Sequence, residues 1–87
     1  MTKREIVKRV SDAEGIPIRT VRVVINDLLD IVKETVEDGD DVVLSNFGTF
    51  TSKRWQGREI KGAGLITDRR TPRFIPSKKF KVQLNKK

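Results

Sequence analysis

Lysine and arginine side chains are concentrated in the second half of this 87-residue chain, and their type and spacing are suited to ligand binding. Residues 49–87 carry twelve of them against two acidic residues, a net charge of +10, whereas residues 1–48 carry seven against ten, a net of −3. Charge segregated in this way is typical of nucleic-acid binding, or less commonly of binding to an anionic membrane surface. We therefore expect phosphate contacts from Lys53, Arg54, Arg58, Lys61, Arg69, Arg70, Arg73, Lys78 and Lys79.

Few of the residue types that catalysis requires are present. The chain has no cysteine and no histidine, so it lacks a thiolate nucleophile, the usual general base and the commonest metal ligand. Asp40 and Asp41 are adjacent, but neighbours in a strand point to opposite faces of a sheet. We expect no catalytic residue, no enzyme activity, no metal, no cofactor and no small-molecule substrate. A signal peptide and a membrane-spanning apolar run are also missing, so we expect a cytoplasmic protein without a membrane partner.

A long β-hairpin is predicted to carry the basic residues. Residues 42–44 are apolar, include β-branched side chains and are bounded by turn formers, which indicates a strand. We expect a turn over residues 45–48, an outgoing strand over about 49–58, a tip at 62–64 and a return strand closed by Pro72 and Pro76. The result is a three-stranded antiparallel sheet that continues into a β-arm of about residues 54–71.

Three phenylalanines lie at the base of the expected sheet. Phe47 and Phe50 lie on either side of Gly48, and Phe74 follows on the return strand. Phenylalanines beside strands are more often buried than stacked on nucleobases, so we predict that these three belong to the core. A two-stranded ribbon alone is marginal in water, so we expect the arm to become ordered on its ligand.

Two amphipathic helices are predicted in the first 39 residues. Thr2 and Glu5 fit a capping box that begins a helix over residues 3–14, and Gly15 is suited to ending it. A longer helix over residues 18–38 has its apolar side chains on one broad arc. The first helix is too short to cover that arc, so we expect a second copy of the chain to do so. The alternative is that the hairpin covers it within one subunit.

The last residues are predicted to form a short helix or a strand. Ser77 can cap a helix, whereas the alternation of Phe80, Val82 and Leu84 also suits a strand. In the helix, Lys78 and Lys79 would lie at the N-terminus, where cations oppose the macrodipole. Such a placement suits a phosphate site, and the alternative is a frayed lysine-rich tail.

Several segments, in order, resemble the bacterial HU and integration host factor family of DNA-bending proteins. The most specific is Gly39–Asp40 followed by Phe47–Gly48–Thr49–Phe50, and residues 74–78 are similar to the family's segment where the arm rejoins the body. The resemblance covers nearly the whole chain and implies one α+β domain. Residues 1–39 would form a helical dimerisation part, 40–76 the sheet and arm, and 77–87 a short C-terminal helix.

The resemblance also implies a binding mode, which is known for the family and not worked out from these residues. Two chains would form an intertwined dimer, as a homodimer or a heterodimer, with two β-arms in the minor groove of double-stranded DNA. The body of the dimer, including Lys3 and Lys81, would hold the flanking phosphates.

The tip of the arm departs from the family. The family's tip usually carries Arg-Asn-Pro-Gln-Thr-Gly, whose proline wedges between base pairs, but residues 60–65 contain no proline and the arm is several residues shorter. Kinking by proline is therefore not carried over. We hypothesise that Ile60 or Leu65 supplies an apolar wedge; the alternative is that the two pack on each other across the hairpin.

Two other functions are possible for the same sequence. Residues 10–26 resemble the helix-turn-helix of bacterial repressors, although the second helix continues through an acidic face that phosphates would repel. A basic ribbon also suits an RNA-binding or ribosome-associated module. The charge pattern and the resemblance favour an architectural protein that binds and bends duplex DNA with little sequence specificity. We expect it in the nucleoid, or in the equivalent compartment of a virus or organelle.

Overall fold

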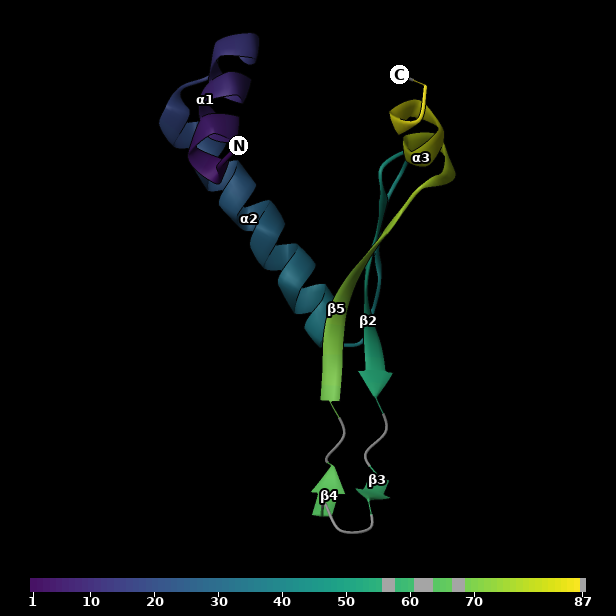
Figure 1. The fold of residues 1–87 in the computed structure, drawn as a ribbon. Helices are drawn as coiled ribbons and strands as arrows, with labels where there is room; N and C mark the ends of the chain where they lie inside the picture. Colours follow the sequence, from purple (N-terminus) through teal and green to yellow (C-terminus); the bar gives the residue numbers. More distant parts are fainter. Residues whose placement is uncertain (56–57, 61–63, 67–68, 87) are drawn as a thin grey trace. The chain divides into compact units, whose positions relative to one another are not determined.

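The computed structural model describes residues 1–55, 58–60, 64–66 and 69–86, with side chains for residues 1–54 and 69–86. Its elements are, in order, α1 (Lys3–Glu14), α2 (Ile18–Glu37), β1 (Val42–Leu44), β2 (Gly48–Trp55), β3 (Arg58–Ile60), β4 (Gly64–Ile66), β5 (Arg69–Pro76) and α3 (Lys78–Leu84) (Figure 1). This is the α+β arrangement that the sequence predicts. Backbone contacts divide the chain into two compact units, residues 1–33 and 34–87.

In the first unit, local signals set the bounds of α1. The Thr2 hydroxyl accepts a hydrogen bond from the Glu5 N–H at 3.3 Å, which satisfies one of the unpaired donors at the start of the helix. Gly15 has the left-handed φ of 67° and donates to the Ser11 carbonyl at 2.9 Å, which ends the helix. Capping residues therefore predicted this helix correctly.

The longer helix α2 ends in a Schellman motif. Gly39, with φ 87°, donates to the Val36 carbonyl at 3.0 Å, and the next N–H, that of Asp40, donates to the Thr35 carbonyl at 3.1 Å. The helix ends at Glu37, one residue before the predicted end. Among the described residues, no helix is long and apolar enough to cross a membrane.

Three strands of the second unit form an antiparallel sheet in the order β1-β2-β5, and β3 pairs with β4 in a separate two-stranded ribbon beyond it (Figure 1). The outgoing strand was expected to run to about residue 58, but β2 ends at Trp55 and β3 begins at Arg58. The predicted tip, residues 62–64, lies outside the described residues except for Gly64, the first residue of β4.

Of the two prolines predicted to close the return strand, Pro76 is the last residue of β5, as predicted, but the prediction is wrong for Pro72. Pro72 lies inside β5, opposite Ser52, and the ladder continues on both sides of it. Since β5 lies at the edge of the sheet, proline is tolerated there, because its missing N–H can fall on the side that faces no further strand.

All four phenylalanines of the chain meet at the base of the sheet. Ring centroids are 5.0 Å apart for Phe47 and Phe74, 4.9 Å for Phe50 and Phe74, and 5.5 Å for Phe47 and Phe80. We call this group the aromatic cluster. It includes Phe80, which was not predicted to belong to the core.

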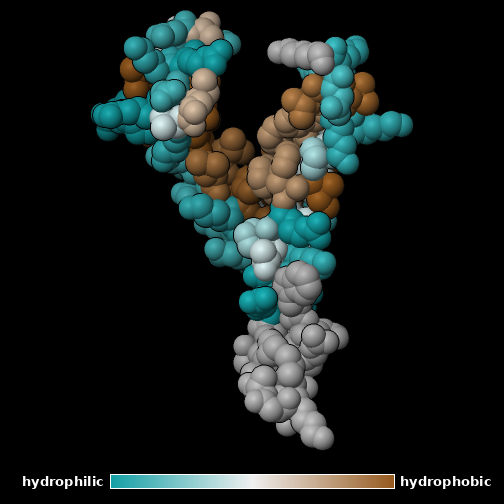
Figure 2. Space-filling view, viewed as in Figure 1, coloured by the Kyte–Doolittle hydropathy of each residue, from teal (hydrophilic) through white to brown (hydrophobic). Residues whose placement is uncertain are grey.

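The cluster depends on Gly48. A Cβ at this position would lie 2.6 Å from the Phe74 ring and 2.7 Å from the Ile75 carbonyl oxygen, so only glycine lets the two strands approach this closely. Phe47 and Phe74 nevertheless remain 43% and 39% exposed. Apolar atoms also remain at the surface of each unit (Figure 2). A single chain therefore leaves its core incomplete.

The C-terminal segment is a helix, and the strand alternative is wrong. The Ser77 hydroxyl accepts from the Phe80 N–H at 3.1 Å and begins α3. The Ser77 N–H donates to the Phe47 carbonyl at 2.9 Å, which ties the start of α3 to the turn between β1 and β2.

Candidate nucleic-acid interface

The register of β2 and β5 separates their residues onto two faces. Residues directly opposite one another in an antiparallel pair share a face, and successive residues alternate between faces. Lys53 lies opposite Thr71, and the pairs two residues away on either side join Thr51 to Arg73 and Trp55 to Arg69. Lys53, Arg69 and Arg73 therefore lie on one face, which we call the basic face.

The other face is apolar near its base. Phe50 lies opposite Phe74 on this face, and Val42 of β1 is opposite Phe50 on the other side of β2. Further along the ribbon the same face carries the pair Arg54 and Arg70. We call this the aromatic face. The register therefore divides the predicted phosphate contacts of the ribbon into two groups, because Arg54 and Arg70 do not share a face with Arg69 and Arg73.

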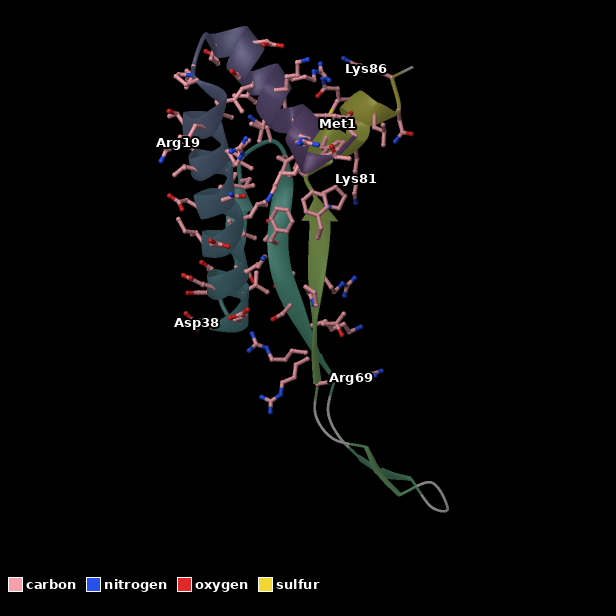
Figure 3. All side chains as sticks on the ribbon, turned by 90° about the vertical axis from the view of Figure 1, so that its left-hand side faces the viewer. Met1, Arg19, Asp38, Arg69, Lys81 and Lys86 are labelled. Carbon is pink, nitrogen blue, oxygen red and sulfur yellow. The ribbon has the colours of Figure 1, made fainter. Side chains whose placement is uncertain are left out.

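On the basic face, the arginines are accessible. Arg69 and Arg73 are exposed, and neither side chain has a hydrogen bond or ion pair with another residue in the part of the chain that the structure describes. Arg69 lies at the end of β5 where the arm begins (Figure 3). The Thr51 hydroxyl, on the same face, donates to a carboxylate oxygen of Asp41 at 2.5 Å. The exposed guanidinium groups are thus positioned to meet a polyanion.

Arg70 has a different environment. Its guanidinium donates to the carbonyls of Glu37 at 2.7 Å and Val36 at 2.6 Å, in the last turn of α2. It also donates to the Ser52 hydroxyl at 3.3 Å. The group that the sequence predicted to bind phosphate is therefore occupied by protein acceptors.

Three predicted cations belong to α3. Lys78 and Lys79 are exposed in its first turn. Lys81 is exposed further along the helix, where Figure 3 labels it. With seven residues, the helix is short, so any attraction for an anion rests on the lysine charges themselves.

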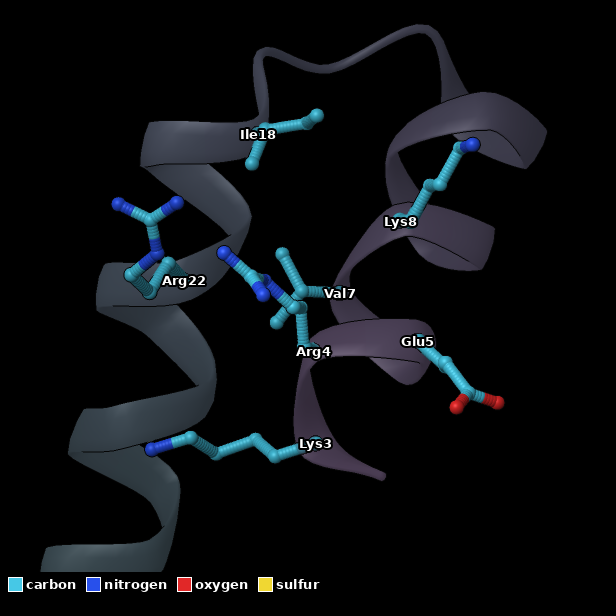
Figure 4. A pocket seen from close by; sticks show the side chains of 7 residues that line it. All are labelled: Lys3, Arg4, Glu5, Val7, Lys8, Ile18 and Arg22. Atoms are coloured by element: carbon cyan, nitrogen blue, oxygen red, sulfur yellow. The ribbon is translucent and has the colours of Figure 1, made fainter. Parts of the chain in front are cut away.

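Lys3 lies in the first unit, where its ammonium group donates to the side-chain oxygen of Asn26 at 2.8 Å. It lines a groove of about 530 Å³ between α1 and α2, whose lining includes Val7 and Ile18. Three further cations line the same groove (Figure 4): Arg4, Lys8 and Arg22.

These three cations were not among the residues predicted from the sequence. Arg4 and Lys8 are four residues apart and so share a face of α1. This spacing could have indicated from the sequence that the two cations lie together. Only the packing of α1 on α2 brings Arg22 beside them. The groove makes them candidates for body contacts together with Lys3.

The remaining predicted contacts lie on the distal arm. The side chains of Arg58, Ile60 and Leu65 are outside the described residues, as is Lys61 altogether. The backbone register of β3 and β4 is described, and it sets Ile60 opposite Gly64 and Leu65 opposite Glu59. Ile60 and Leu65 are therefore not cross-strand partners.

The family of bacterial DNA-binding proteins matches residues 1–85 of the chain. The chain belongs to this family. A DNA-binding protein HU-beta 2 of Neisseria meningitidis is 32% identical to it over 98% of this chain and 99% of that protein. An integration host factor subunit alpha of Idiomarina loihiensis is 33% identical over 97% of this chain and 91% of that protein.

Solved structures agree with these sequence matches. The chain of an Anabaena HU–DNA cocrystal structure superposes with a TM-score of 0.85 at 27% identity, and the match covers 100% of both chains. The resemblance to HU and integration host factor is thus confirmed. The protein is a member of a family of DNA-binding architectural proteins, of which a dimer is typical.

Proposed function

We propose that this protein is a non-enzymatic architectural protein that binds and bends double-stranded DNA with little sequence specificity. The observation that carries the proposal is the basic face, where exposed arginines follow the ribbon toward the arm in a member of a DNA-binding family. The HU chain of the Anabaena HU–DNA cocrystal structure matches this one along its whole length, which supports duplex DNA as the partner.

Affinity in this proposal comes chiefly from counterion release as lysines and arginines approach phosphates. The arms lie in the minor groove, where the pattern of base-edge donors and acceptors is degenerate, so they gain little sequence information there. Preference among sites then comes from how easily each sequence deforms. The groove cations and the α3 lysines would hold the flanking duplex from the body.

We propose that the active form is an intertwined homodimer. Val7 and Val21 are the only buried apolar residues in the described part of the chain, each 4% exposed. On α2, Val24 is 61% exposed, Leu28 48% and Ile31 58%. Apolar surface on this scale is rarely left open in a soluble protein, so a second copy is the natural cover. Integration host factor subunits alpha and beta among the relatives leave a heterodimer as the other outcome.

We propose that the protein is located in the cytoplasm, associated with the nucleoid.

We also propose an apolar wedge at the tip of the arm, supplied by Ile60 or Leu65. Since the two residues are not directly paired in the β3–β4 register, packing on one another is a weaker alternative than the sequence indicated. Fluorescence transfer across end-labelled duplexes at saturating protein measures bending. We expect Ile60→Ala or Leu65→Ala to reduce it, and unchanged transfer in both would end the wedge proposal.

The main test replaces residues 56–68 by Asn-Gly, a two-residue turn that suits the facing ends Trp55 and Arg69. Ring closure of short duplexes and binding over a range of salt concentrations are then measured for both proteins. We expect the full chain to close rings and its log affinity to fall by about 0.9 per phosphate contact for each unit of log salt. The shortened chain should lose ring closure but keep weak binding. An affinity independent of salt contradicts the proposal.

Two further measurements separate the alternatives. Sedimentation at micromolar concentration should give the mass of a dimer, and a monomer would contradict the homodimer. Competition between duplex DNA and structured RNA tests the RNA-binding alternative, and binding to one operator alone would favour the helix-turn-helix.

A further inference from the structure

We infer that Arg70 is a positioning residue that fixes the root of the β-arm to the end of α2, and that it is not a phosphate ligand. The consequence for DNA rests on the proposed function, because it concerns how the arm is presented. The attachment itself is a property of the free protein.

The hydrogen bonds of Arg70 supply the first step. Its two terminal nitrogens donate to consecutive carbonyls, Val36 at 2.6 Å and Glu37 at 2.7 Å, and one of them also reaches the Ser52 hydroxyl at 3.3 Å. Bonds from a charged donor are shorter and stronger than neutral ones. The planar guanidinium fork is suited to holding two acceptors at once, which a lysine cannot do in the same way.

The end of α2 explains why a cation belongs there. The Schellman motif supplies backbone donors to Thr35 and Val36 but leaves the Glu37 carbonyl, at the negative end of the helix dipole, for Arg70. The guanidinium also lies over Gly39, where an added Cβ would be 3.6 Å from it. Arg70 therefore completes the helix terminus that the backbone alone leaves partly unsatisfied.

The position of Arg70 on the ribbon supplies the second step. It lies on the aromatic face, opposite Arg54 and two residues beyond the pair of Ser52 and Pro72. Two like charges directly opposite one another are unfavourable, and the bonds to α2 offset that cost. Arg69 and Arg73, in the same strand, lie on the other face without such acceptors. A phosphate bound by the basic face would not reach Arg70 unless three hydrogen bonds broke.

This attachment restrains the arm where it leaves the sheet. Arg70 lies four residues along β5 from Phe74, so the aromatic cluster anchors one end of the strand and Arg70 the other. Without Arg70 the ribbon would be held by the cluster alone and would leave the sheet over a wider range of directions. An arm without a fixed direction grips bent DNA less well.

The test compares Arg70→Gln with Arg69→Gln, which removes the same charge from the neighbouring residue on the basic face. Hydrogen exchange in the free protein is measured first. We expect Arg70→Gln to speed exchange of the Gly39 and Asp40 amides and of the arm-root amides, those of residues 51–54, 69–71 and 73, by roughly tenfold. Arg69→Gln should leave these rates unchanged.

DNA measurements separate positioning from phosphate binding. For a dimer, Arg69→Gln should lower the slope of log affinity against log salt by about 1.8, from two lost contacts. Arg70→Gln should leave the slope unchanged and reduce bending of end-labelled duplex at saturating protein, a quantity that a loss of stability alone would not alter. Arg70→Lys keeps the charge and can reach one carbonyl, so it should bend DNA more than Arg70→Gln and less than the original chain. The same measurements can be made on Arg70→Lys if Arg70→Gln does not fold.

Two results would overturn the inference. A lowered salt slope with unchanged exchange in Arg70→Gln would make Arg70 a phosphate ligand. Unchanged exchange and unchanged bending would show that the hydrogen bonds to α2 do not hold the arm. If the protein fails to bind DNA at all, the proposed function fails, and the exchange rates of the free protein still decide whether Arg70 fixes the arm root.

Discussion

The two faces of the β2–β5 ribbon are made of alternate residues of the same two strands, yet their side chains have different surroundings. On the aromatic face, Phe50 and Phe74 pack at the base, and Arg70 is bonded to the end of α2 further along. On the basic face, Arg69 and Arg73 are exposed, and their side chains carry no hydrogen bond to another described residue. The environment of a basic side chain in this ribbon therefore depends on which face its position in the strand gives it, and not on its charge alone.

This comparison predicts that substitutions on the two faces have separable effects. Changes to Phe50, Phe74 or Arg70 on the aromatic face should lower the free energy of unfolding without altering the salt dependence of DNA binding. Changes to Arg69 and Arg73 on the basic face should do the reverse, because exposed side chains without hydrogen bonds to other described residues contribute little to stability.

The largest effect is expected at Phe50, whose ring lies 4.9 Å from that of Phe74 and 6.4 Å from that of Phe47. Phe50→Ala should lower the free energy of unfolding by about 3 kcal/mol, measured by urea denaturation of the dimer at fixed protein concentration. Phe50→Leu, the control, retains most of the apolar volume and should cost less. If Phe50→Ala is as stable as the original chain, the aromatic cluster is not the core of this unit.

Gly48→Ala should also be destabilising, by about 2 kcal/mol, because its methyl group would collide with the Phe74 ring and the Ile75 carbonyl. Gly15→Ala provides a matched control. Gly15 has nothing within 4 Å of an added Cβ but has a φ of 67°, so the cost there is only that of a left-handed alanine, about 1 kcal/mol. Thermal unfolding should therefore rank the two variants, and the reverse order would contradict the close approach at Gly48.

On the basic face, Arg73→Gln should change binding and not stability. We expect the salt slope to fall by about 1.8 in a dimer and the affinity to fall roughly tenfold at moderate salt. The free energy of unfolding should stay within about 0.5 kcal/mol. A variant that loses stability while its salt slope is unchanged would place Arg73 with Arg70 and remove the distinction between the faces.

The sequence predicted the helices and the base of the sheet well, because local signals determine them. Thr2, Gly15 and Gly39 act on their own neighbours, and the caps they form need no tertiary information. For α3 the local signals conflict, because alternating apolar residues favour a strand and a serine cap favours a helix in a segment this short. The Ser77 hydrogen bonds, one of them to the Phe47 carbonyl, favour the helix.

The candidate interface was predicted less completely, since the positions of its residues depend on strand register and on packing. Arg69, Arg70 and Arg73 look equivalent in the sequence, and only the pairing of β2 with β5 separates Arg70 from the other two. Pro72 suggests a strand end because nothing local marks β5 as an edge strand. The groove cation Arg22 is fourteen residues or more from Arg4 and Lys8, so only the fold brings them together.

The smallest effect is expected from the cap of α3, at the end of β5 that lies farthest from the arm. Ser77→Ala removes the bond to the Phe80 N–H, and loss of such a cap costs about 1 kcal/mol. The helix has seven residues and would not persist alone, so the loss should reach Phe80 and its stacking on Phe47. Ser77→Asp, the control, keeps an acceptor and should retain stability. Lys78 and Lys79 remain in both variants. The slope of log affinity against log salt should therefore change in Ser77→Ala only if the contact of these lysines with DNA requires the helix. An unchanged slope together with a loss of stability would show that stability and binding are separable at this end of the unit.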